Sequence, residues 1–353
     1  MKLRVICLLL PLFLLGCSKK SPEAERRANI QPSSTLPFQI TVAESPETME
    51  INDISNRAAN LLATKDYDKL DDLAATYRAS KEAYPDGMWK LAYVYAGTDG
   101  PENAPEDQWP AHQKEIEAWI QAKPQSITAR VALARFLRDY AWHARGSGYA
   151  NTVTDESWQL FGQRLTRAAA ILTDAKNLKE TCPVYWSTFL GVALGLEANK
   201  EQYDRIFDQA ARAEPDYHFY YQTRAVYLLP RWHGQPGEWE EDLAKSADRI
   251  GGEDGDMLYA QVVWDIHHYG SSDNVFDENK GISWERVDRG FEVIEKRFPD
   301  SIAAKNERAH LAGLAGDKEK ARKYFIQTEG KVDLSDWNAK GEFIDAANWA
   351  FAP

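Results

Sequence analysis

Apolar residues recur at spacings of three and four along most of the chain after residue 48. Because an α-helix completes a turn every 3.6 residues, this spacing predicts amphipathic helices. Alternation with a period of two is scarce, so no sheet is predicted. The clearest predicted helices cover residues 54–77, 129–144, 165–178, 185–196, 203–213, 258–269, 287–298 and 302–315. The pattern therefore indicates an all-α chain.

Four prolines follow a bulky apolar residue at a constant distance of eight positions. The pairs are Tyr77 and Pro85, Ile116 and Pro124, Phe207 and Pro215, and Phe291 and Pro299. This arrangement resembles the tetratricopeptide repeat, in which the second helix of one repeat ends at a proline and the next repeat begins after it. The resemblance implies stacked α-α pairs with one continuous core, a tetratricopeptide-like solenoid.

The clearest copy of this repeat runs from Phe298 to Phe325. Within it, Gly316-Asp317 is expected to form the turn between two helices, and Ala321 and Phe325 match the second-helix signature. We therefore expect residues 285–353 to form C-terminal tetratricopeptide-like helices that pack on the same solenoid as residues 48–284.

A second resemblance covers roughly residues 85–250. Four short motifs are similar to those of the bacterial family called domain of unknown function 4034: Ala141-Trp142, Ala144-Arg145-Gly146, Gly148-Tyr149-Ala150 and Leu229-Pro230-Arg231-Trp232. His233 stands where another glycine is expected, before Gly234. No activity is attached to that family, so the resemblance implies an architecture for residues 48–284 and no reaction.

The N-terminus has the pattern of an export signal. Lys2 and Arg4 precede an apolar run that ends at Gly16-Cys17, and this run is too short for the roughly 20 residues that span a bilayer. Leu14-Leu15-Gly16-Cys17 resembles the lipobox of bacterial lipoproteins. That resemblance implies that residues 1–16 are removed and that Cys17 carries the lipid. Ser18 then favours sorting to the outer membrane, with the body facing the periplasm.

Residues 17–47 are rich in serine, proline and charged residues, which predicts a flexible tether. After Cys7 is removed and Cys17 is lipidated, Cys182 has no disulfide partner in the chain. It precedes Pro183 and an apolar run, so we expect a small buried residue at a helix entrance.

The chain has 353 residues, 44% of them hydrophobic, which excludes wholesale disorder. Its 54 acidic and 42 basic side chains give a formal charge of −12, and loss of Lys2 and Arg4 with the signal brings it to −14. This charge disfavours nucleic acid as a partner and favours basic or neutral partners.

Three aromatic clusters are candidates for a ligand-binding groove. Trp142, Arg145 and Tyr149 recur at spacings of three and four; Arg231-Trp232-His233 lies in a loop rich in glycine and proline; Trp264 and His267 share a helix face. In solenoids such aromatic residues also serve as packing anchors between helices, which is the main alternative for Trp142 and Trp264. In a groove, arginine would bind carboxylates and the aromatic faces would stack on peptide or sugar rings.

No catalytic residue, metal site or cofactor is predicted. His267 and His268 diverge by about 100 degrees on a helix, which makes them a poor pair of metal ligands. The acidic loop at residues 251–256 lacks the ligand spacing of a calcium-binding loop, and nucleophile and phosphate-binding motifs are absent from the sequence.

These features predict a lipid-anchored scaffold that binds a protein or peptide. Two alternatives remain open at this point: a carbohydrate-active enzyme on an α/α toroid, with two carboxylates from distant loops, or an envelope-assembly lipoprotein without a small-molecule site. A deep central cleft lined by Asp or Glu would favour the enzyme.

Overall fold

A computed structural model describes residues 30–100, 105–146, 148–178, 182–269, 274–276, 281–337 and 339–353. Within these residues the chain forms 15 α-helices and one two-stranded sheet, so the all-α prediction is confirmed. The helices are α2 (Pro46–Ala63), α3 (Tyr67–Ser80), α4 (Leu91–Ala96), α5 (Trp109–Ala122), α6 (Ile127–Arg145), α7 (Asp155–Ala175), α8 (Pro183–Gly195), α9 (Lys200–Ala213), α10 (Phe219–Tyr227), α11 (Glu238–Ile250), α12 (Gly252–His268), α13 (Trp284–Arg297), α14 (Ile302–Leu314), α15 (Lys318–Gln327) and α16 (Lys340–Phe351). The strands are β1 (Thr41–Ala43) and β2 (Lys331–Asp333).

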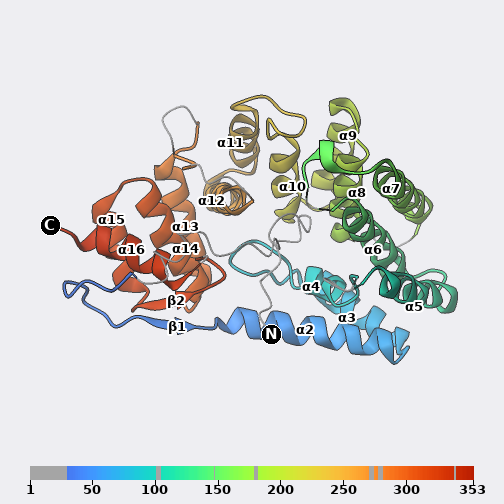
Figure 1. Cartoon of the computed structure of the whole chain (residues 1–353), viewed down its shortest axis with the longest axis horizontal. Coiled ribbons are helices and arrows are strands. Elements are labelled where there is room, and N and C mark those ends of the chain that lie inside the picture. The colour runs from blue at the N-terminus through green and yellow to red at the C-terminus, as the bar shows by residue number, and fades with distance from the viewer. Residues whose placement is uncertain are drawn as a thin grey trace.

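The helices are arranged as a solenoid that bends into an arc (Figure 1). From α5 onward each helix packs against the next along the chain, and α6, α8, α10 and α12 also contact one another in that order. These four helices face the interior of the arc, whereas α7, α9 and α11 lie on its outer side (Figure 1). Contacts between neighbours and next neighbours are typical of an α-α solenoid.

Burial differs between the two layers for a simple reason. The outer helix α9 buries one stripe, Tyr203, Phe207 and Ala210, whose spacings of four and three match one helix face. The inner helix α8 is buried almost all round, from Val184 to Leu194, because it contacts α6, α7, α9 and α10. An amphipathic sequence therefore suits the outer position of α9, and the largely apolar sequence of α8 suits its inner position.

Prolines and caps set the ends of several helices, as the sequence predicts. Ser126 and Ser301 each follow a proline by two residues, and their hydroxyl oxygens accept hydrogen bonds from the backbone N–H groups of Ala129 (2.9 Å) and Ala304 (3.1 Å). Gly316 has a φ of 71°, and Asp317 then caps α15. The predicted turn at Gly316-Asp317 is confirmed.

The sequence predicts one continuous helix over residues 54–77, and this prediction is wrong. The chain instead forms α2 and α3, which are separated at Thr64–Asp66, where Lys65 adopts a left-handed conformation with a φ of 59°. This break turns the chain so that α3 packs back against α2. Both helices bury residues in the same core, so the apolar spacing continues from α2 into α3. For this reason the sequence pattern does not reveal the break.

The prediction of a flexible tether over residues 17–47 is wrong for its last part. Strand β1 pairs in parallel with β2, and Phe38 packs edge-on against Phe343 (6.4 Å between ring centroids) and Phe351 (5.9 Å). Each strand has three residues, too few for an alternating pattern to be recognised, which is why no sheet was predicted. Residues 17–29, with Cys17, lie outside the described residues.

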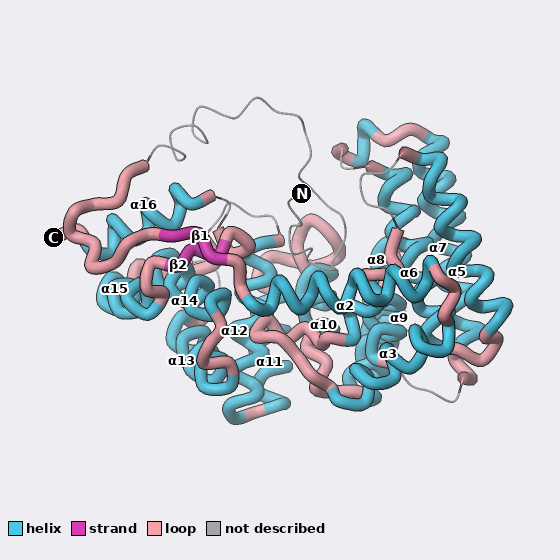
Figure 2. Tube along the Cα trace, turned by 90° about the horizontal axis from the view of Figure 1, so that it is seen from below, coloured by secondary structure: helices cyan, strands magenta, loops and turns pink. Residues whose placement is uncertain are grey.

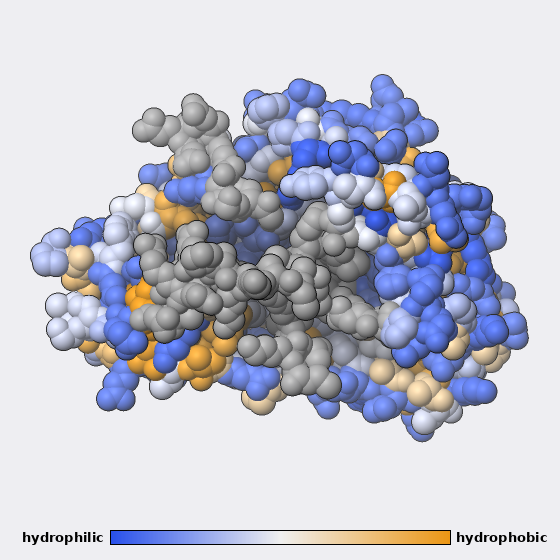
Figure 3. Space-filling view, in the orientation of Figure 1, coloured by the Kyte–Doolittle hydropathy of each residue, from blue (hydrophilic) through white to orange (hydrophobic). Residues whose placement is uncertain are grey.

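The N-terminal segment joins the two ends of the arc. Seen from below, α2 crosses the molecule between β1 and α3 (Figure 2). It contacts α3, α4 and α5 at one end, while β1 leads to β2 and the C-terminal helices at the other. The face seen in Figure 3 is largely hydrophilic, and hydrophobic residues gather at its lower left.

Candidate functional site

A groove of about 920 Å³ lies where the C-terminal ends of four helices meet. Its lining includes residues from the ends of α3, α9, α11 and α13, together with the hairpin around Gly87 and the first turns of α10 and α12. We call it the helix-end groove. Two of the prolines identified in the sequence are near its rim: Pro215 lines it, and Pro299 follows the lining residue Phe298. Prolines follow the ends of α9 and α13, whereas the C-cap of α3 is Lys81 and that of α11 is Gly251, both with a positive φ.

The floor of the helix-end groove is held by a hydrogen-bonded pair. The Gln261 side-chain N–H donates to the Pro85 carbonyl oxygen (2.7 Å), so its amide oxygen faces His218 Nδ1 at 2.6 Å. His218 Nδ1 must therefore carry the hydrogen, and burial lowers the pKa of this histidine, which favours its neutral form. Gly87 allows this approach: its φ is 82°, and a Cβ atom there would lie 2.7 Å from the Gln261 amide oxygen.

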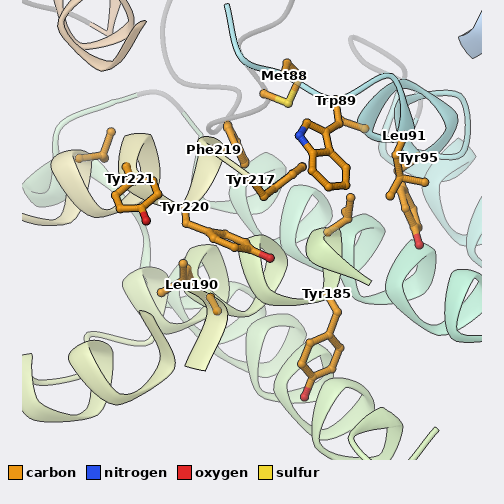
Figure 4. Close-up of a cluster of buried hydrophobic side chains, with 14 of the residues drawn as sticks. Met88, Trp89, Leu91, Tyr95, Tyr185, Leu190, Tyr217, Phe219, Tyr220 and Tyr221 are labelled. Atoms are coloured by element: carbon orange, nitrogen blue, oxygen red, sulfur yellow. The ribbon is translucent and has the colours of Figure 1, made fainter. Parts of the chain in front are cut away.

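Aromatic side chains form one wall of the groove. Trp89 packs edge-on against Tyr217, with ring centroids 5.2 Å apart, and Tyr221 packs edge-on against Phe207 at 5.4 Å. Figure 4 shows Trp89 directed from the segment before α4 toward Tyr217. Trp89 and Tyr221 are only 2% and 6% exposed, so these rings fix the shape of the wall and offer little of their own surface to a ligand.

The lining carries four cations, Lys81, Arg212, Arg249 and Arg297, and three carboxylates, Asp208, Asp216 and Asp254. The partner of Lys81, Glu214, is a fourth carboxylate beside them, so the charges are balanced. Lys81 pairs with Glu214 (2.8 Å), and Arg297 pairs with Asp254 (2.6 Å). Arg212 donates only to a backbone carbonyl oxygen of its own helix, that of Asp208. Among the described residues, neither Arg212 nor Arg249 forms an ion pair.

The predicted residues Trp142 and Trp232 do meet, although they lie away from the helix-end groove. Their rings cross at 89° with centroids 6.0 Å apart. Trp142 is buried and Trp232 is half-buried. The Arg145 guanidinium lies over the rings of Trp142 (6.0 Å) and Trp158 (5.6 Å) and donates to the carbonyl oxygen of Gly148 (2.5 Å).

The other predicted loop residues have separate partners. Arg231 lies over the Tyr269 ring (4.5 Å) and donates to its carbonyl oxygen (3.1 Å). His233 stacks on Tyr227 with ring centroids 4.6 Å apart. Tyr149 is 85% exposed. The structure thus joins Trp142, Arg145 and Trp232 into one packed group.

Trp264 and His267 belong to a different group, which includes residues far along the chain. His310 of α14 stands edge-on to Trp264 (5.6 Å) and to His267 (5.1 Å), and it stacks on Trp337 (4.1 Å). Three carboxyl groups lie beside these rings: Asp265, Glu307 and Asp336. We call these seven residues the acidic–histidine cluster.

Burial dominates the chemistry of the acidic–histidine cluster. Removal from water and the repulsion of nearby carboxylates raise the pKa of Asp265, Glu307 and Asp336 well above their usual values. Burial and the neighbouring histidines hold the pKa of His310 well below its usual value. The neutral forms of Asp265, Glu307, Asp336 and His310 are therefore favoured. Within the described residues, no three His, Cys, Asp or Glu side chains are placed to hold a metal ion.

Cys182 is buried at the N-cap of α8, as the sequence predicts for a small residue at a helix entrance. Its sulfur lies 3.2 Å from the Tyr95 hydroxyl. Across the described part of the chain, each helix is too short or too polar to cross a membrane.

Comparison with known proteins adds a family likeness. Residues 56–192 match the model of the family described as domain of unknown function (DUF4034). This part of the chain is a DUF4034-like segment. No curated protein and no solved structure matches the chain.

The DUF4034-like segment begins within α2 and ends within α8. It includes the motifs around Trp142 and Tyr149, whereas the motif at Leu229–Trp232 lies beyond it. It also supplies one side of the helix-end groove, through Lys81, Tyr84 and Trp89. The remaining sides come from helices that follow the matched residues.

Proposed function

We propose that this protein is an envelope lipoprotein whose helical solenoid binds an extended segment of a partner protein in the helix-end groove. The lipid would be carried by Cys17, and the folded body would face the periplasm from the outer membrane. The observation that carries the proposal is the groove itself, which is large enough for several residues of an extended peptide.

Two features of the groove support binding of a partner. Its aromatic wall and the hydrogen bonds between Pro85, Gln261 and His218 are already in place, so a ligand need not order them. Its rim offers guanidinium groups that lack an ion pair among the described residues. A rigid apolar wall beside polar donors is the usual composition of a recognition site.

The buried carboxyl groups favour a second candidate, a carbohydrate-active enzyme. A carboxyl group with a raised pKa can serve as a general acid. However, Glu307 and Asp336 are only 6% and 4% exposed, which leaves little access for a sugar ring. Hydrolysis of a glycan panel by the native protein, abolished in Glu307→Gln, would establish the enzyme instead.

Photo-crosslinking in the native envelope tests the binding proposal. p-Benzoylphenylalanine would replace Ala211, which lines the groove, or Glu156, an exposed residue on α7 outside it. We expect a discrete crosslinked product only from position 211, and the segment identified by mass spectrometry should bind the purified protein as a synthetic peptide. Identical products from both positions, or none from position 211, would contradict the proposal.

A further inference from the structure

The first described residues of the chain are fastened to the last helix, α16. The Ser33 N–H donates to the side-chain oxygen of Asn348 (2.8 Å), and the Asn348 side-chain N–H donates to the carbonyl oxygen of Gln31 (3.0 Å). Phe38 packs edge-on against Phe351 of the same helix, with ring centroids 5.9 Å apart. The segment before β1 and α16 thus lie together at one end of the molecule (Figure 2). The chain leaves the described body toward its N-terminus from the surface of α16.

The position of this exit limits how far the body can stand from a lipid on Cys17. Ile30 follows Cys17 by 13 positions in the chain. Thirteen residues span at most about 45 Å even when fully extended, and any shorter path brings the bilayer closer. A bilayer within this reach is present at α16 at a high effective concentration. Contacts that are too weak to hold a free protein on a vesicle are therefore sufficient here.

Apolar side chains are exposed beside the exit. Trp349 follows Asn348 on α16 and is 41% exposed, and Ile326 on α15 is 52% exposed. Figure 3 shows hydrophobic residues gathered toward the end of the arc at which Figure 1 places β1, β2 and α16. A single exposed apolar residue is common on any protein surface. These two are distinguished by their position next to the point at which the chain turns toward the proposed lipid.

Cation–ring contacts join these apolar residues into one surface. Lys318, Arg322 and Ile326 follow one another at spacings of four, so they lie on the same face of α15. Lys318 lies over the Trp349 ring (6.0 Å), and Arg322 lies over the Phe351 ring (5.9 Å). We call these five residues the chain-end face.

The chemistry of the chain-end face suits the boundary between lipid and water. Tryptophan is favoured at this boundary because its ring is apolar and its N–H is polar. Lysine and arginine lay their apolar stems on such a surface and keep their charges in water. Lys323 beside Arg322 adds a third cation, while Glu319 and Asp345 are exposed on the same two helices. The net charge is therefore small, and the apolar side chains would provide the contact.

We propose that the chain-end face rests on the phospholipid bilayer that holds the lipid of Cys17, with Trp349 and Ile326 inserted among the headgroups. The bilayer is the occupant because the chain leaves for its lipid from this face and has only 13 residues in which to reach it. Helices α5 and α7, at the opposite end of the arc in Figure 1, would then point away from the membrane. This inference rests on the proposed lipidation and adds the orientation of the body.

The test uses the mature lipoprotein reconstituted into vesicles of phosphatidylethanolamine and phosphatidylglycerol. In a Cys182→Ala background, the fluorophore NBD is attached through Lys323→Cys on α15, or through Glu156→Cys on α7 as the matched control; both positions are exposed. We expect nitroxide-labelled phospholipid to quench the fluorophore at position 323, with a blue-shifted emission. The fluorophore at position 156 should remain unquenched.

A second comparison separates insertion from mere closeness. Ile326→Asp combined with Trp349→Asp should abolish quenching at position 323, while the protein still floats with the vesicles through its lipid. Leu196→Asp, at an exposed apolar residue away from the chain-end face, should leave the quenching unchanged. Circular dichroism of the variants should match that of the wild type, because the substituted side chains are exposed.

The outcomes distinguish this inference from the proposed function. If the wild-type protein carries no lipid and does not float with the vesicles, the lipoprotein proposal itself fails. If it floats but positions 323 and 156 are quenched equally, or neither is quenched, the orientation is wrong and the anchor stands. Quenching that persists in the Asp double variant would also overturn the inference. So would p-benzoylphenylalanine at position 326 that crosslinks in the native envelope to a protein and not to phospholipid.

Discussion

At the scale of single residues, the acidic–histidine cluster shows how packing changes the chemistry of ordinary side chains. Asp265 comes from α12, Glu307 from α14, and Asp336 from the segment after β2. Burial is the largest cause that raises the pKa of each carboxyl group, and the charge of Glu307 further raises the pKa of Asp265 and of Asp336. Such groups hold their protons more tightly in the folded chain than in the unfolded one, so ionisation opposes folding.

Glu307→Gln should therefore stabilise the protein as the pH rises. Above the unfolded pKa of about 4.3, the unfolded chain releases a proton that the folded wild type retains, which lowers wild-type stability by about 1.4 kcal/mol for each pH unit up to the raised pKa. The Glu307→Gln variant has no carboxyl group at this position, so its stability does not fall with rising pH for this reason. Urea unfolding at several pH values should show no difference at pH 4 and an increasing advantage of the variant above it.

The comparison with wild type removes the contribution of other titrating groups. His310 acts in the opposite direction, because its lowered pKa makes the fold lose stability as the pH falls below about 6.5. Glu319→Gln, at an exposed position on α15, is the matched control and should follow the wild type. A Glu307→Gln variant that is equally or less stable than the wild type at pH 8 would refute this account.

At the scale of elements, small residues set the distance between neighbouring helices. Gly290 of α13 faces α12 so closely that a Cβ atom would lie 2.2 Å from the Asp256 carbonyl oxygen and 2.6 Å from the Ala260 Cβ atom. Gly313 of α14 has no atom within 4 Å of that position. Both glycines lie within helices, but only Gly290 has atoms of a neighbouring helix close to the position of a Cβ atom.

The same substitution should thus have opposite effects at the two sites. Gly290→Ala must separate α12 from α13, and we expect it to lower the free energy of unfolding by about 1–3 kcal/mol. Gly313→Ala gains helix propensity without a clash and should raise it by about 0.5–1 kcal/mol. Chemical denaturation measures the free energy of unfolding of both variants. If the two substitutions change it in the same direction, the close contact between α12 and α13 does not limit stability.

At the scale of the whole molecule, the N-terminal segment is a structural tie. Strand β1 holds the C-terminal end of the arc through β2, and α2 holds the other end through α3, α4 and α5. In the lipoprotein that we propose, the lipid on Cys17 would precede Thr41 by 24 positions in the chain.

Cys17→Ala should abolish incorporation of labelled palmitate, because in the lipoprotein that we propose this residue carries the lipid. Metabolic labelling measures this effect. Cys182→Ala removes a buried cysteine of the folded body and should leave the label intact. Label that persists in Cys17→Ala would disprove lipidation at this residue.

Part of the candidate site could be inferred from sequence. Pro215 and Pro299 follow two of the helix ends that line the helix-end groove, and Trp264 and His267 do belong to a cluster of aromatic and titratable groups. Arg212 and Arg249 were missed because basic residues are common in the last turn of a helix. Glu307, His310 and Asp336 were missed because they are 43, 46 and 72 positions away from Trp264 in the chain.

The sequence by itself determined the helices, several of their ends and the net charge, because these depend on spacings of a few residues and on composition. The tertiary structure alone decided the break at Lys65, the pairing of β1 with β2 and the convergence of four helix ends on one groove. It also decided which arginines remain without an ion pair among the described residues. These features depend on contacts between distant segments, and a local pattern carries no information about which distant segments will meet.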